Sequence, residues 1–129
     1  MLHDLGLVLN GSWITNDHRF EVDSAGTATD FVEAQLAHSY ESSEWDANRL
    51  QLLFDAILLS SEPKLSLYKQ PTVAATVQGV LVDVQGAEYG ITSAEYAGIE
   101  AAFPRLNFIS GVNQTLVKLA ATKSSTTYG

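Results

Sequence analysis

The sequence predicts a single α+β domain in which a mostly antiparallel sheet packs against a pair of helices. Several short segments alternate apolar with other residues, which is the pattern of a half-buried strand. Two longer segments repeat apolar residues at helical spacing instead. The chain has 129 residues, 46% of them hydrophobic, which is enough for one domain with its own core. We therefore expect one domain over residues 1–129, ending in a polar tail at residues 123–129.

Two short strands are expected near the N-terminus. Leucines alternate with other residues at the start of the segment 5–14, and Asn10 followed by Gly11 favours a turn inside it. Residues 19–22 predict a second strand that pairs with the first. Residues 23–27 read Asp-Ser-Ala-Gly-Thr, a composition typical of a loop, and the first helix is expected to begin after them.

A helical hairpin follows these strands. Val32, Leu36 and Tyr40 are spaced at i, i+4 and i+8, which is the stripe that one face of a helix buries, and they predict a helix over residues 29–40. Two acidic residues in its first turn support this assignment, because negative charge stabilises the N-terminal end of a helix. A second helix is predicted over residues 44–60.

The second helix of the hairpin is apolar on nearly all sides. Ser43 and Asp46 resemble a capping box at its start. A helix with apolar residues nearly all round is buried on more than one side, and in so small a domain we expect the second side to face another subunit. The interface candidates on this helix are Trp45, Leu52, Phe54 and Leu58.

The second half of the chain predicts most of the sheet. Residues 64–70 lie between two prolines and predict an edge strand. Residues 72–85 are the clearest strand, because apolar residues occupy both of the alternating faces, as in a strand that is covered on both sides. On one of these faces, Val73 and Val77 are further interface candidates.

A third helix and two more strands complete the expected fold. Thr92 and Glu95 form a Thr-x-x-Glu capping box, and the helix that it starts is predicted to end at Phe103, before a proline. Residues 106–110 and 114–121 predict two strands around a turn. The expected buried stripe of the helix is Tyr96, Ile99 and Phe103.

Acidic residues are concentrated in the first half of the chain. The formal net charge is −8, and residues 1–62 contain eleven acidic and two basic residues, whereas residues 63–129 contain four acidic and five basic ones. The acidic half disfavours nucleic acid and anionic lipid surfaces as partners. No segment has the length of a membrane span or the pattern of a targeting signal. We therefore expect neither nucleic acid nor membrane as a partner.

The sequence carries no recognisable catalytic or metal-binding motif. It has no cysteine, and its three histidines lack the spacing of a metal pair. A Gly-x-Ser-x-Gly nucleophile elbow and a glycine-rich phosphate loop are both absent. Asp55 is the one candidate for acid–base chemistry, because burial in its apolar helix would raise its pKa. We expect no catalytic, metal-binding or cofactor-binding residues, and no cofactor.

Without such motifs, the sequence favours a protein that works by packing against other proteins. The second half is rich in small and β-branched residues and poor in long charged ones, which suits a subunit that packs against copies of itself. We expect a soluble, non-enzymatic structural or assembly subunit, made in the cytoplasm, that binds copies of itself or other structural proteins, as phage capsid, neck, tail and cement proteins do. Tyr128, in the polar tail, is the last interface candidate.

Two alternatives stay open. The acidic first half is also typical of an adaptor, immunity or inhibitor-type protein that binds a basic partner. A small enzyme with an NTF2-like pocket, in which a curved sheet wraps around helices, would use a carboxylate such as Asp55 as its general base. The oligomeric state separates the first two hypotheses, and the enzyme hypothesis requires Asp55 inside a pocket.

Overall fold

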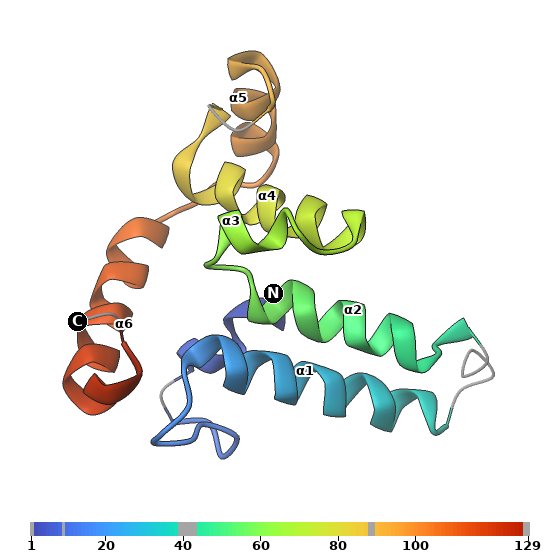
Figure 1. Cartoon of the computed structure of the whole chain (residues 1–129). Coiled ribbons are helices and arrows are strands. Elements are labelled where there is room, and N and C mark those ends of the chain that lie inside the picture. The colour runs from blue at the N-terminus through green and yellow to red at the C-terminus, as the bar shows by residue number, and fades with distance from the viewer. Residues whose placement is uncertain (1, 9, 39–43, 88–89, 128–129) are drawn as a thin grey trace.

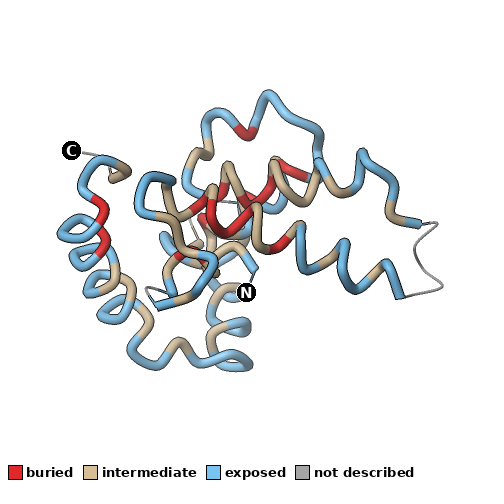
Figure 2. Tube along the Cα trace, turned by 90° about the horizontal axis from the view of Figure 1, so that it is seen from below, coloured by how far each residue is buried: buried red, intermediate tan, exposed pale blue. Residues whose placement is uncertain are grey.

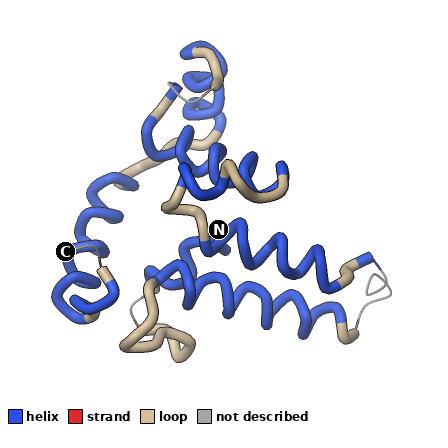
Figure 3. The backbone as a smooth tube through the Cα atoms, viewed as in Figure 1, coloured by secondary structure: helices blue, strands red, loops and turns tan. Residues whose placement is uncertain are grey.

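The fold is all-helical. The computed structural model describes residues 2–8, 10–38, 44–87 and 90–127, and it is 71% helical with no strand in these ranges (Figures 1 and 3). The predicted α+β class, with its antiparallel sheet, is therefore wrong. In chain order the elements are the 3₁₀ helix η1 (Leu2–Leu7), α1 (Phe20–Leu36), α2 (Ala47–Leu58), α3 (Pro63–Ser66), α4 (Pro71–Gln85), α5 (Ser93–Ala102), α6 (Phe108–Thr122) and the 3₁₀ helix η4 (Ser124–Thr126).

The elements form a helical hairpin with further helices stacked on it (Figure 1). α1 and α2 lie side by side and run antiparallel, and η1 packs against α1. α4 packs on α2, and the short α3 leads into it. α5 stands at the far end of this stack, whereas α6 lies to one side, next to η1.

The predicted helical hairpin is present in the structure. α2 lies within the predicted range 44–60, and most of the predicted helix 29–40 belongs to α1. The Asp46 side chain caps α2 by accepting a hydrogen bond at 2.8 Å from the backbone N–H three residues along. Its predicted capping partner Ser43, like Tyr40, lies outside the described residues.

The prediction is wrong over residues 19–27, because α1 begins at Phe20 and runs through this segment. Ala25 and Ala28 are fully buried against Ile57 of α2, and this contact forms the centre of the core. Burial in the core outweighs the weak helix propensity of the segment. Because both alanine side chains are small, α1 and α2 pack closely here.

Gly6 explains why η1 replaces the strand that residues 5–14 predict. It is buried where η1 meets the start of α1, and its N–H donates a hydrogen bond of 2.7 Å to the Ser24 hydroxyl. A Cβ atom at this position would lie 2.0 Å from the carbonyl oxygen of Phe20. The N-terminal segment therefore packs on α1 through backbone, and the alternating leucines reflect no strand.

The predicted strand 72–85 is helix α4. Its buried residues are Val73, Val77 and Leu81. Their spacing of i, i+4 and i+8 is even, so the same residues fall on one face of a helix and on one face of a strand. Pro71 favours the helix, because proline is well accommodated in the first turn.

The remaining predicted strands are also wrong. Residues 64–70 form α3 and a turn, and residues 106–110 and 114–121 fall largely on α6, which runs without a break through the expected turn. The residues of α6 that are at least partly buried follow a helical repeat; they are Phe108, Val112, Thr115 and Leu119.

The capping box of α5 is confirmed. The Thr92 hydroxyl accepts a hydrogen bond from the Glu95 N–H at 3.2 Å, and the Glu95 carboxylate accepts one from the Thr92 N–H at 2.8 Å. The hydrogen bonds from the backbone and hydroxyl of Thr92 lower the pKa of Glu95. The expected buried stripe is wrong, however, because α5 contains no buried residue and Phe103, which follows it, is 76% exposed.

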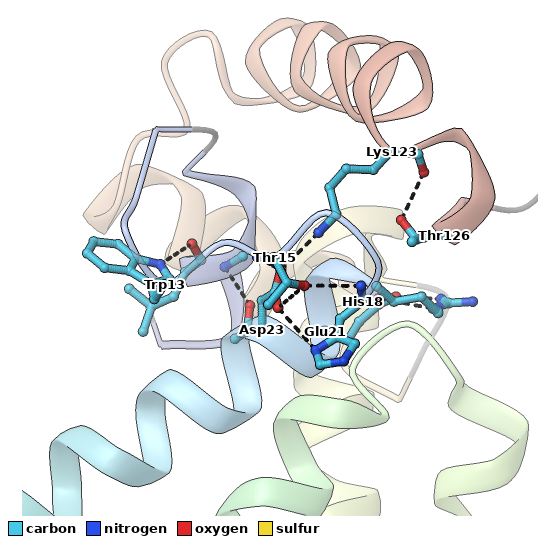
Figure 4. Close-up of polar contacts among 11 residues, drawn as sticks. Trp13, Thr15, His18, Glu21, Asp23, Lys123 and Thr126 are labelled. Atoms are coloured by element: carbon cyan, nitrogen blue, oxygen red, sulfur yellow. Dashed lines mark hydrogen bonds and ion pairs between the residues drawn. The ribbon is translucent and has the colours of Figure 1, made fainter.

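A buried polar cluster around Asp23 joins the two ends of the chain (Figure 4). The Asp23 carboxylate accepts hydrogen bonds from the Thr15 N–H at 3.1 Å and the Thr15 hydroxyl at 2.9 Å. The Lys123 ammonium, at the end of α6, forms an ion pair with the same carboxylate at 2.9 Å. The two charged side chains are 1% and 4% exposed, so the tail expected to be polar begins with a buried lysine.

We expect Gly6→Ala to lower the free energy of unfolding by about 3 kcal/mol, because the added methyl group overlaps backbone atoms that cannot move independently. Gly26→Ala is the matched control: it lies in α1, and a Cβ atom there meets nothing within 4 Å. We expect this control to raise the free energy of unfolding by about 0.5–1 kcal/mol. Urea denaturation of both variants measures the difference, and equal effects would contradict the close approach of η1 to α1.

Candidate functional site

Two adjoining hollows form a groove along α4. The first, of about 540 Å³, lies between η1, α2 and α4. The second, of about 730 Å³, lies between α4 and α5. Both are lined by His3, Thr76 and Val80, and the two hollows therefore form one continuous groove.

The walls of the groove are mainly apolar. Trp45, Leu52 and Leu53 contribute the wall on the side of α2. Along α4, Thr76, Gly79 and Val80 line the groove beside the buried face of the helix. On the side of α5, the lining residues include Ile91, Tyr96, Ile99 and Phe103. Such a surface suits an apolar partner better than a charged one.

Arg105 is the main polar anchor of the groove. Its Nη2 donates a hydrogen bond to Asp83 Oδ1 of α4 at 3.0 Å, and its Nε lies 3.2 Å from Glu100 Oε1 of α5. The guanidinium also lies 5.3 Å from the ring centre of Tyr96 and 5.8 Å from that of Phe108. These contacts join α4, α5 and the start of α6 at one side chain. Because α5 buries no residue, its position depends largely on Arg105.

The interface residues that the sequence predicts lie in different surroundings in the structure. Trp45 and Leu52 line the groove. Phe54 and Leu58 are partly buried against the core. Val73 and Val77 are fully buried inside the chain, so their side chains are not presented on its surface. Tyr128 lies outside the described residues.

Sequence reasoning missed the contribution of α5 and Arg105 to the groove. The apolar repeat of α5 is visible in the sequence, but periodicity alone does not show whether such a stripe faces the core or a groove. Arg105 gave no signal in the sequence, because its partners Asp83 and Tyr96 come close only when α4 and α5 fold back on each other.

Asp55 is not among the residues that line the groove. Its side chain is 14% exposed and accepts hydrogen bonds from Lys69 and Gln51, each at 2.9 Å. Partial burial alone would raise the pKa of Asp55, but the hydrogen bonds from Lys69 and Gln51 and the charge of Lys69 outweigh it and lower the pKa. This arrangement keeps the carboxylate ionised and paired, whereas a general base in a pocket needs a raised pKa and a free lone pair.

Other kinds of site find little support in the part of the chain that the structure describes. No three histidine or carboxylate side chains there lie close enough to hold a metal ion together. None of its helices combines the length and the apolar character that a bilayer span requires. No protein-family model matches the chain, and neither a curated protein nor a solved structure shows significant similarity to it.

We expect Asp55→Asn to lower the free energy of unfolding at pH 7 by about 0.5–1 kcal/mol. A carboxylate whose pKa is lowered by folding stabilises the folded state above its unfolded pKa of about 3.9. That contribution is lost as the pH falls through the native pKa, so wild type and variant converge in acid. Urea denaturation at pH 7 and near pH 2.5 measures this convergence.

Asp30→Asn, on the exposed surface of α1, is the control for removing an acidic charge and is expected to have little effect at either pH. If Asp55→Asn were equally destabilising at both pH values, the ion pair with Lys69 would not be the source of the effect.

Proposed function

We propose that this chain is a non-enzymatic structural subunit that functions by binding copies of itself. The proposal rests on the size of the chain's solvent-accessible surface. The accessible surface is 8570 Å², whereas a compact monomer of 13.9 kDa exposes about 6,700 Å². The difference of about 1,900 Å² exceeds the roughly 800 Å² that each partner buries in a standard interface.

The character of the excess surface supports association. Large apolar side chains are exposed along the last two helices and the segment between them, including Phe103 at 76%, Leu106 at 93% and Val117 at 70%. In Figure 2 most of α6 is exposed. Lys118 is the one charged residue in α6, although helices in contact with water normally carry charged residues on their outer face.

The groove along α4 is the surface we assign to this contact. It is apolar, and Gly79 and Thr76 leave room for a second helix to approach α4 closely. Its far wall is formed by α5, which has no buried residue of its own. A second copy would therefore bury both the groove and the helix that borders it.

A particle built from many copies is a setting in which such a surface is covered. We therefore also propose, as the sequence leads us to expect, that the subunit is made in the cytoplasm and incorporated into a virus particle. The support for this part is that subunits of permanent complexes bind each other through large and more apolar interfaces.

Light scattering coupled to size exclusion tests the proposal. We expect a multimer of the 13.9 kDa chain whose mass changes little between low and high salt, because apolar contacts are not screened. Ile99→Lys, which places a charge in the groove, is expected to shift the protein toward the monomer. Gln35→Lys, on the exposed face of α1, adds the same charge elsewhere and is expected to leave the mass unchanged.

A monomer at all concentrations and salt levels would overturn the proposal. Equal dissociation by the two lysine variants would overturn the assignment to the groove. Circular dichroism shows whether both variants keep their helices.

A further inference from the structure

α6 is attached to the rest of the molecule mainly at its two ends. Its first residue, Phe108, contacts Arg105, and near its last turn Leu119 and Lys123 are buried. Between these points most of the helix is exposed (Figure 2). Among the described residues, the hydrogen bond from Lys123 to Asp23 is the one that ties this helix to the N-terminal half. α6 is therefore an arm whose end docks in a polar site.

The docking site for this arm is specific. Lys123 Nζ lies 2.9 Å from Asp23 Oδ2, and Thr15 donates two further hydrogen bonds to the same carboxylate (Figure 4). A buried carboxylate requires such a partner, because an unpaired buried charge is strongly destabilising. Apolar packing around the arm is looser, since a hollow of about 630 Å³ separates Lys118 and Thr122 from the N-terminal segment. The Asp23 carboxylate therefore requires the Lys123 ammonium as its partner. A Lys123 from the same chain and one from a second copy meet this requirement equally well.

The connection between α5 and α6 is strained. Leu106 has a φ angle of +50° and a side chain that is 93% exposed. A leucine in the left-handed region clashes with its own backbone, and nothing covers its side chain to compensate. An extended connection would relieve this strain, and short strained hinges are a recognised cause of arm exchange between copies.

From these observations we infer that two copies exchange their α6 arms, so that Lys123 of one copy pairs with Asp23 of the other. The hinge is the segment 106–107, which follows Arg105 and leaves its contacts with Asp83 and Glu100 in place. The exchanged dimer keeps the buried ion pair, because Lys123 docks in the same site on the second copy, and it relieves the strain at Leu106. This inference rests on the proposed self-association and adds to the groove a second contact between the two copies, which is the exchanged arm.

Charge reversal distinguishes an arm that docks in its own chain from one that docks in a second copy. Asp23→Lys and Lys123→Asp each place two like charges in the site. When the two variants are unfolded in urea and refolded together, exchange restores an opposite-charge pair in both sites of a mixed dimer. We expect native mass spectrometry to show that more than half of the dimers are mixed, which exceeds random pairing. The double variant, with both reversals in one chain, is the control that restores the pair without mixing.

Separate, unmixed species from this refolding, together with a folded double variant, would overturn the exchange. A wild-type oligomer that fails this mixing test would leave the proposed function standing and remove only the exchange. A wild-type monomer would remove both.

A second pair of variants tests the hinge without touching the ion pair. Leu106→Ala and Leu106→Gly both remove the apolar side chain, but only glycine adopts a positive φ angle without strain. We expect the glycine variant to dimerise roughly tenfold more weakly than the alanine variant, because its closed monomer is no longer strained. Equal dissociation constants, measured by sedimentation, would overturn the role of the hinge and with it the exchange.

Discussion

The buried carboxylate of Asp23 is the point on which the arrangement of the chain depends. It belongs to the first turns of α1, accepts two hydrogen bonds from Thr15 in the N-terminal loop and pairs with Lys123 at the end of α6. A carboxylate that is 1% exposed is tolerated only with such partners. The loop and the last helix are therefore held where their donors reach this group, although Lys123 lies 100 residues further along the chain.

Polar contacts of this kind position the helices, and apolar burial contributes less than is usual for a domain of this length. The contact between α1 and α2 is centred on two alanines and Ile57, while α5 buries nothing and is held by Arg105. Hydrogen bonds and ion pairs define geometry but add little net stability, because the same groups are well solvated when the chain unfolds. The apolar side chains left on the surface are then a source of free energy that a second copy can use.

The sequence predicts the elements whose signals lie in neighbouring residues, and it misses those that depend on contacts between residues far apart in the chain. Local signals were sufficient for α2, whose cap is Asp46, and for α5, whose capping box is Thr92 and Glu95. The sheet was wrongly predicted because the even spacing of Val73 and Val77 fits a strand and a helix equally well. The groove was not predicted, although two of the predicted interface residues, Trp45 and Leu52, line it, since its other wall and the contacts of Arg105 arise from residues that are distant in sequence.

Acidic residues are concentrated on the α1–α2 hairpin, whereas the helices with exposed apolar surface carry fewer charges. The exposed acidic residues Asp30, Glu33 and Asp46 lie on the α1–α2 hairpin and at the start of α2, whereas α4 and α6 each contain a single charged residue. Like charges on neighbouring copies repel each other, so charge disfavours contact between hairpins and opposes the proposed association least at α4 and α6. In the self-association that we propose, the acidic hairpins face water and the contacts between copies form on the helices with fewer charged residues.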